Sequence, residues 1–121
     1  MKIKIKNIPL PDDIHVGSHT YVPPETIVMI QADINYSMIF LKNGNKVIVS
    51  TCLKKLENRF AIIHSFARVH KSYLVNLDYF KSYYEGHFLL ENDLKCIVSR
   101  RKYKRLIEEK RVIIYKQTVI Y

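Results

Sequence analysis

Apolar and polar residues alternate with a period of two along much of the chain, a pattern that predicts half-buried β-strands. Two such stretches flank Asn43-Gly44 and two more flank Glu85-Gly86, and a glycine in a dipeptide of this kind favours a hairpin turn. Segments 59–66 and 68–77 are also apolar, but their spacing leaves a strand and a single helical turn as alternatives. The remaining strands are expected in residues 1–8, 19–22, 26–32, 94–98 and 111–121.

The period changes to that of an amphipathic helix in two places. In residues 51–59 the apolar side chains recur near helical spacing, and the hydroxyl of Ser50 or Thr51 can cap the first turn. A second helix is expected over residues 100–109, with Ser99 as its cap.

The length of 121 residues is typical of one domain, and no repeat or change of composition divides the chain. We therefore predict a single mainly β domain over 1–121, with an N-terminal strand and turns in 1–18 and a C-terminal extension in 108–121. No stretch reaches the roughly 20 apolar residues of a membrane span. We expect a cytoplasmic protein that does not enter the membrane.

The charge changes this picture from a generic β domain to one with a preferred kind of partner. Residues 95–116 hold nine basic and two acidic residues, which is +7 of the net charge of +9. Such a concentration favours a polyanionic partner, while a basic face that is merely solvated remains the alternative. Arg100, Arg101 and Lys102 occupy the first turn of the second helix, although a helix N-terminus favours acids. A phosphate supplied from outside would relieve this repulsion.

The sequence gives little support for catalysis or metal binding. Cys52 and Cys96 lie in apolar segments and are expected in the core, not in a zinc site. Gly17 between His15 and His19 argues against a helical pair of metal ligands. Nine tyrosines could stack on single-stranded bases, but several occupy apolar positions where core packing is the simpler role. We expect no enzyme activity, no metal and no cofactor.

Residues 66–80, FARVHKSYLVNLDYF, place cations among apolar side chains, where unpaired charge is costly. This stretch resembles the signature of the LytTR family of bacterial DNA-binding domains, F-x-R-x-H-[RK]-S-[YF]-[LV]-V-N. The segments TIVMIQADINYSMIFLKNG, STCLKKLENRF and CIVSRRKYKRL are similar to other parts of that domain, so the resemblance covers about residues 19–107. The matching signature positions are Phe66, Arg68, His70, Lys71, Ser72, Tyr73, Leu74, Val75 and Asn76.

The resemblance implies an elongated arrangement of small antiparallel sheets with one or two short helices. It implies a sequence-specific, double-stranded DNA-binding domain of a response regulator-like transcriptional regulator, whose loops enter successive major grooves. A homodimer on repeated half-sites is compatible with it. The side chains that the resemblance assigns to DNA are Asn35, Tyr36, Ser37, Lys71, Arg100, Arg101 and Lys102.

Several roles stay open at this point. Arg68 and His70 are expected to bond backbone or carboxylate groups, with a phosphate contact as the alternative, and the same alternatives apply to Lys104. For the whole domain, the competing hypothesis is a protein-interaction or self-association module that pairs through exposed strand edges.

Overall fold

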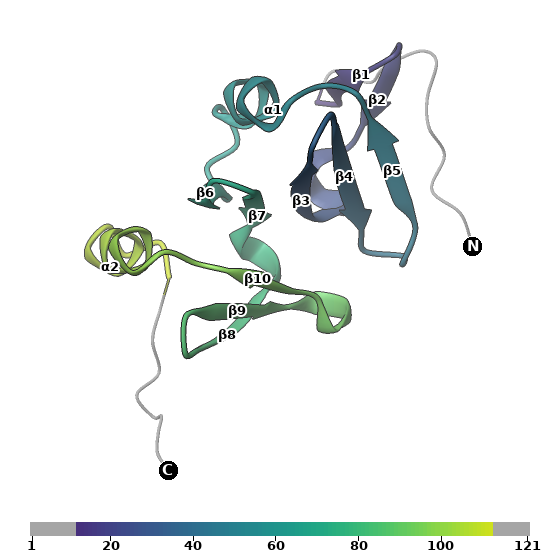
Figure 1. The fold of residues 1–121 in the computed structure, drawn as a ribbon. Helices are drawn as coiled ribbons and strands as arrows, with labels where there is room; N and C mark the ends of the chain where they lie inside the picture. The colour runs from purple at the N-terminus through teal and green to yellow at the C-terminus, as the bar shows by residue number, and fades with distance from the viewer. Residues whose placement is uncertain (1–11, 113–121) are drawn as a thin grey trace.

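A computed structural model describes residues 12–112, so the strand expected in 1–8 and all but the first two residues of the strand expected in 111–121 lie outside the described residues. Within that range the chain forms ten strands and two helices (Figure 1). The helices are α1 (Leu53–Phe60) and α2 (Arg100–Glu108). The strands are β1 (Ile14–Gly17), β2 (Thr20–Val22), β3 (Ile27–Asp33), β4 (Tyr36–Leu41), β5 (Lys46–Val49), β6 (Phe66–His70), β7 (Tyr73–Asn76), β8 (Phe80–Tyr84), β9 (His87–Leu90) and β10 (Lys95–Ile97).

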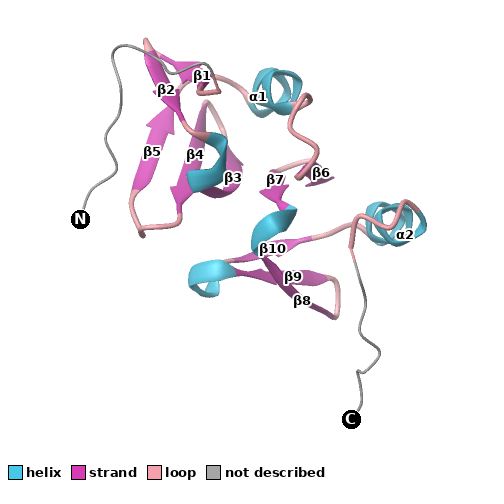
Figure 2. Cartoon of the chain, turned by 180° about the vertical axis from the view of Figure 1, so that it is seen from behind, coloured by secondary structure: helices cyan, strands magenta, loops and turns pink. Residues whose placement is uncertain are grey.

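The described strands form three antiparallel sheets. The largest has the order β5-β4-β3-β7-β6, a second has the order β10-β9-β8, and β1 pairs with β2 alone. Figure 2 shows α1 and the β1–β2 hairpin beside the five-stranded sheet, and the three-stranded sheet with α2 at the opposite end of the molecule. This arrangement confirms the predicted class: mainly β, with small antiparallel sheets and two short helices.

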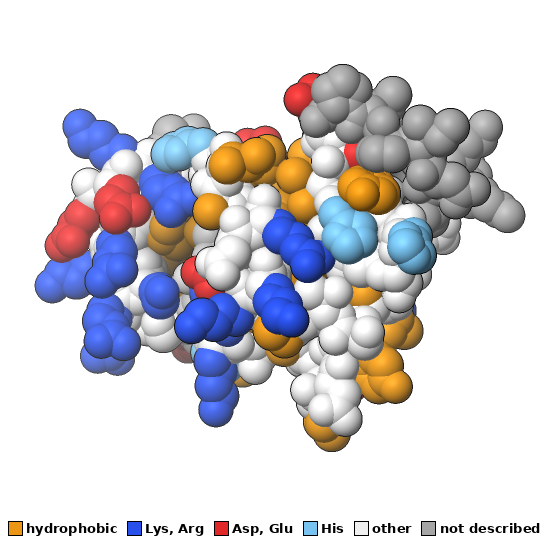
Figure 3. Space-filling view, turned by 90° about the horizontal axis from the view of Figure 1, so that it is seen from above, with side chains coloured by type: hydrophobic (Ala, Val, Ile, Leu, Met, Phe, Trp, Pro, Cys, Tyr) orange, Lys and Arg blue, Asp and Glu red, His pale blue; other side chains and the backbone are white. Residues whose placement is uncertain are grey.

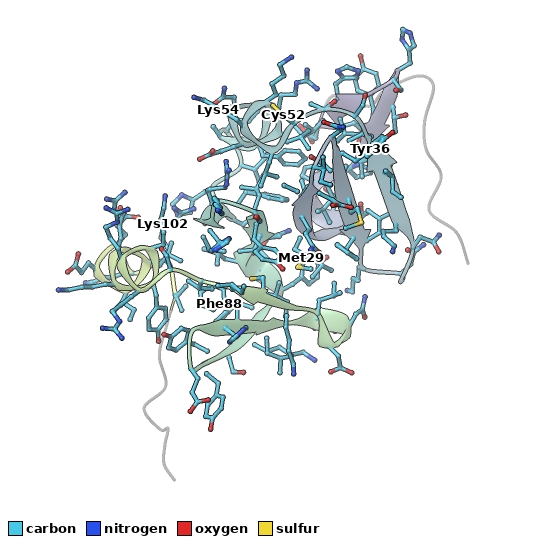
Figure 4. The ribbon with its side chains drawn as sticks, viewed as in Figure 1. Met29, Tyr36, Cys52, Lys54, Phe88 and Lys102 are labelled. Atoms are coloured by element: carbon cyan, nitrogen blue, oxygen red, sulfur yellow. The ribbon has the colours of Figure 1, made fainter. Side chains whose placement is uncertain are left out.

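The core lies on both faces of the five-stranded sheet. Ile27 and Ile30 of β3 pack in a cluster with α1 and the β1–β2 hairpin. Val28 and Met29 pack in a second cluster with the three-stranded sheet, where Figure 4 shows Met29 and Phe88. Since β3 is buried on both faces, its sequence is a continuous apolar run and does not alternate.

Segments 59–66 and 68–77, whose secondary structure was open, contain the last turn of α1 and the strands β6 and β7. The strands form because β7 pairs with β3 on one side and with β6 on the other. Asn76 ends β7 as a buried polar residue. Its Nδ2 donates to the carbonyl oxygen of Ile27 at 3.0 Å, and its Oδ1 accepts from the backbone N–H of Asp78 at 3.0 Å. The signature asparagine therefore ties β7 to the start of β3.

The start of α1 differs from the prediction. The N-cap is Cys52, not Ser50 or Thr51, and its side chain makes no capping hydrogen bond. The chain stays extended through Cys52, with φ −72° and ψ 158°, so that Leu53 takes the buried position. The prediction that both cysteines lie in the core was consequently wrong for Cys52, which is exposed, and right for Cys96.

Two further differences concern the N-terminal part and the second helix. Strand β1 was not expected, although Ile14 and Val16 alternate with His15 and point into the core. The cap of α2 agrees with the prediction, because Ser99 Oγ accepts from the backbone N–H of Lys102 at 3.2 Å. Neither described helix is long and apolar enough to cross a membrane.

Candidate nucleic-acid interface

Three connections of the fold lie close together: the β3–β4 turn, the β6–β7 turn and the start of α2. The backbone N–H of Ala32, near the end of β3, donates to the carbonyl oxygen of Ser72 in the β6–β7 turn at 2.9 Å. The backbone N–H of Ser99, before α2, donates to the carbonyl oxygen of Val69 in β6 at 3.0 Å. Sheet pairing therefore fixes the first two turns relative to each other, and β6 fixes the position of the third.

A groove of about 570 Å³ lies between the start of α1, the β6–β7 turn and the start of α2. Its lining includes several cations and a single acid, Glu57. Figure 3 looks onto the molecule from above and shows basic side chains gathered over the α2 side and the centre of this face. The lining residues are Lys54, Glu57, Arg68, His70, Lys71, Ser99, Arg101 and Lys102.

The sequence-predicted residues Lys71, Arg101 and Lys102 are thus brought together in one groove. Lys71 and Arg101 are exposed and Lys102 is half-buried. Coulomb repulsion among such cations is unfavourable when no counter-charge is present. The arrangement therefore favours an anion in or across the groove.

Arg68 frames the β6–β7 turn. Its Nε donates to the carbonyl oxygen of His70 at 2.9 Å, and its Nη2 donates to the carbonyl oxygen of Lys71 at 2.6 Å. Its Nη1 donates to Oε1 of Glu57 in α1 at 2.7 Å, which is also an ion pair. All three nitrogens of the guanidinium are therefore engaged within the protein, and they hold the backbone that carries Lys71.

His70 stabilises the same turn from its other side. Its Nδ1 accepts from the backbone N–H of Ser72 at 3.1 Å, and its ring lies 5.8 Å from the ring of Tyr73. The bond from Ser72 requires an unprotonated Nδ1. The two signature residues on either side of Val69 thus bond to the turn that presents Lys71.

The β3–β4 turn differs from the prediction in one residue. Asn35 and Tyr36 are exposed, and Figure 4 shows Tyr36 at the end of β4 nearest the start of α1. Ser37 is 0 % exposed, and its Oγ donates to the carbonyl oxygen of Thr51 at 2.7 Å. The resemblance placed Ser37 on DNA, but successive strand residues point to opposite faces, so Ser37 points inward once Tyr36 points outward.

Arg100 and Lys104 are exposed but do not line the groove. Arg100 begins α2 and precedes two groove residues, so it lies at the margin of the cationic face. Lys104 lies farther along the same helix, and among residues 12–112 it makes no hydrogen bond or ion pair that would make it a structural residue.

Lys54 lines the groove although the sequence did not suggest it. It lies in the first turn of α1, which contains no acidic residue. The same reversal of the preferred helix charge drew attention to the start of α2. Applied to α1, that test would have found Lys54, because both helix N-termini border the groove and both carry lysine or arginine.

Cys52 lies two residues before Lys54 at the N-terminus of α1, where Figure 4 shows both side chains, and it is exposed. The backbone N–H groups of the first turn, that of Lys55 above all, lower the pKa of the Cys52 thiol. By contrast, burial raises the pKa of the Cys96 thiol to about 12. The two thiols therefore differ in both access and acidity.

The β framework holds exposed turns and two helix N-termini around a cationic groove, an arrangement typical of a nucleic-acid-binding domain. The family model of the LytTr DNA-binding domain matches residues 17–111. The chain therefore belongs to the LytTr DNA-binding domain family, as the signature in residues 66–80 indicated.

A solved structure shows the same fold. The LytTr DNA-binding domain of a Bacillus cereus methyl-accepting/DNA response regulator aligns with a TM-score of 0.63 and 17 % sequence identity. The alignment covers 79 % of this chain and 92 % of that one. No curated protein sequence matches the chain.

Proposed function

We propose that this domain binds double-stranded DNA sequence-specifically as part of a bacterial transcriptional regulator in the cytoplasm, and that its loops enter the major groove. The observation that carries the proposal is the single groove shared by Lys71, Arg101, Lys102 and Lys54. These residues come from three separate segments. Their convergence favours a partner with several negative charges in a row, which a DNA backbone provides.

The rigidity of the surrounding backbone supports this function over a merely solvated basic face. Arg68 and His70 form hydrogen bonds with the backbone of the β6–β7 turn, and Ser99 caps α2. A cation on such a fixed backbone loses less conformational entropy on binding than one on a mobile loop. Several polar side chains therefore hold the backbone that positions Lys71 and the start of α2.

We assign different tasks to the cations. Arg101 is exposed and can present its planar guanidinium to O6 and N7 of a guanine, the commonest specific contact in the major groove. Lys71 projects from the neighbouring turn toward base edges or phosphates. Lys102, Lys54 and Arg100 flank these positions and suit phosphates, which position the protein but carry no sequence information.

The test begins with selection of bound duplexes from a random pool, followed by anisotropy titrations of the selected duplex and a scrambled one. Arg101→Ala should reduce the preference for the selected duplex by roughly 5- to 150-fold, since a bidentate base contact supplies about 1–3 kcal/mol of discrimination. Lys102→Ala should weaken binding to both duplexes. It should also reduce the slope of log K against log salt concentration by about 0.9, the value for one lost phosphate contact.

Lys81→Ala is the matched control, because Lys81 lies on β8 in the three-stranded sheet and pairs with Glu91 at 3.9 Å. It should behave as the wild type. The proposal is wrong if the wild type binds scrambled duplex as tightly as the selected one. The assignment of tasks is wrong if Arg101→Ala and Lys102→Ala weaken both duplexes equally.

The same titrations give the stoichiometry. We propose that two copies occupy two repeated half-sites, so the selected sequences should contain a repeat and the complex should hold two protein chains. A single half-site bound by one chain would contradict this part of the proposal and leave DNA recognition intact.

A further inference from the structure

Ile34 is the most exposed large apolar residue among those described, at 96 %. Exposure alone decides nothing, because single apolar residues on a surface are common. Ile34 is unusual because it forms the β3–β4 turn with Asn35, between the paired residues Asp33 and Tyr36. Two of these neighbours, Asn35 and Tyr36, are among the residues that the family resemblance assigns to DNA.

The backbone of Ile34 is as unusual as its exposure. It has φ +39°, in the left-handed region that a β-branched residue rarely adopts. A two-residue hairpin turn normally places Gly, Asn or Asp at such a position. Both the backbone conformation of Ile34 and the exposure of its apolar side chain to water are therefore unfavourable, and no other residue of the turn packs against that side chain to compensate.

The turn lies where an apolar side chain could meet base edges. The hydrogen bond from Ala32 to Ser72 keeps the turn beside Lys71, and Tyr36 next to it is also exposed. The carboxylate of Asp33, exposed at the end of β3, makes phosphates poor neighbours for this tip. A turn with an apolar residue at its tip and an acid beside it fits the base edges on the floor of the DNA major groove better than the phosphates along its sides.

We propose that Ile34 is a specificity-determining residue that contacts the 5-methyl group of a thymine in the major groove. This inference rests on the proposed function. The thymine methyl is the apolar group that the major groove presents, and contact with an apolar side chain is a known way to read it. Asn35 beside it supplies hydrogen-bonding groups for the same base step or the next.

The test uses uracil, which pairs like thymine and lacks only the 5-methyl group. Each thymine of the selected duplex is replaced by uracil in turn, and affinities are measured for the wild type, Ile34→Ala and Ile34→Val. At one thymine the wild type should lose about fourfold in affinity, the equivalent of about 0.8 kcal/mol for one buried methyl-sized group. Ile34→Ala should bind the thymine and uracil duplexes alike, and Ile34→Val should keep most of the difference.

Ile62→Ala is the matched control. Ile62 is 81 % exposed and lies in the segment that enters β6, at the opposite end of that strand from Lys71. It should show the wild-type loss at the same thymine. Thermal unfolding of each variant establishes that it is folded, and Ile34→Val provides a second folded comparison if Ile34→Ala does not fold.

Two results would overturn the inference: a wild type insensitive to every uracil, or an Ile34→Ala variant that keeps the wild-type loss at the sensitive thymine. Failure of the proposed function looks different, since the wild type would then not distinguish the selected duplex from a scrambled one. Specific binding without a methyl effect at Ile34 removes only the inference.

Discussion

Replacing Arg68 by alanine should separate its two candidate roles, support of the β6–β7 turn and contact with phosphate. The structure shows three hydrogen bonds from this side chain, two of them to backbone carbonyls of the turn. If Arg68 acts through the turn, its loss should reduce stability and weaken DNA binding indirectly. If it touches phosphate, the loss should appear in binding and in its salt dependence alone.

The expected magnitude follows from those bonds. A hydrogen bond from a charged donor contributes about 1.5–3 kcal/mol, and two such bonds hold the turn. The lower end applies, because the Arg68 side chain is 20 % exposed and water can reach the freed carbonyls. The ion pair with Glu57, which is 41 % exposed, adds at most about 1 kcal/mol. We therefore expect Arg68→Ala to lower the free energy of unfolding by about 3–4 kcal/mol, or roughly 10–20 °C in Tm.

The binding effect should be smaller and independent of salt. Ordering a released Lys71 costs about 0.5–1.5 kcal/mol, so affinity should fall about two- to tenfold with an unchanged salt slope. Arg68→Lys keeps the charge but lacks the planar fork, so it should recover little stability. Glu57→Gln, which breaks only the ion pair, should cost less than about 1 kcal/mol.

The assays are thermal unfolding and anisotropy titrations at several salt concentrations. The structural role is refuted if Arg68→Ala leaves Tm unchanged and reduces the slope of log K against log salt concentration by about 0.9. Restoration of full affinity by Arg68→Lys, with no change of stability, would lead to the same conclusion.

Three more predictions concern buried polar bonding and the cysteines. Asn76→Ala should lower the free energy of unfolding by about 2–3 kcal/mol in a denaturant titration, because it leaves two backbone groups unpaired; an unchanged midpoint contradicts it. Native protein at pH 7 should be labelled by a thiol reagent at Cys52 only, with Cys96 reacting after unfolding, and DNA should slow the reaction of Cys52; Cys52→Ser is the control, and labelling of native Cys52→Ser refutes the assignment. Because the folded pKa of Cys96 is about 12, above its ordinary value of 9.0, its contribution to stability is complete below pH 9 and is lost as the pH rises toward 12. Cys96→Ala should therefore reduce the alkaline loss of stability measured by chemical unfolding, and an identical pH profile would contradict this.

Much of the fold could be predicted because the local rules agree with the tertiary structure. The turns at Asn43-Gly44 and Glu85-Gly86, the cap at Ser99 and the apolar run of β3 are each determined by nearby sequence. The segment 66–80 was harder, since its apolar residues serve both faces of the sheet. Phe66 and Leu74 belong to one core cluster, whereas Val69 and Val75 belong to the other. Alternation between two buried faces cannot be recognised from hydrophobicity alone.

The candidate site was less predictable because several of its properties depend on partners distant in sequence. Ser37 looks like a polar loop residue until the carbonyl oxygen of Thr51 is brought within 2.7 Å. Lys54 looks like an ordinary solvated lysine until the β6–β7 turn and α2 are placed opposite it. Cys52 follows the apolar pattern of the helix, but α1 begins one or two residues later than a cap at Thr51 or Ser50 would place it.

The two helices explain why the cations are concentrated where they are. Each helix N-terminus adds partial positive charge to the groove, and each first turn adds lysine or arginine instead of the acids that would neutralise it. For an isolated domain this arrangement costs stability at both helices. Ser99 Oγ offsets part of the cost at α2 by accepting from the Lys102 backbone, while Cys52 makes no side-chain capping bond at α1. A bound phosphate would supply acceptors and negative charge at both ends, so DNA binding should stabilise α1 and α2 more than the sheets between them.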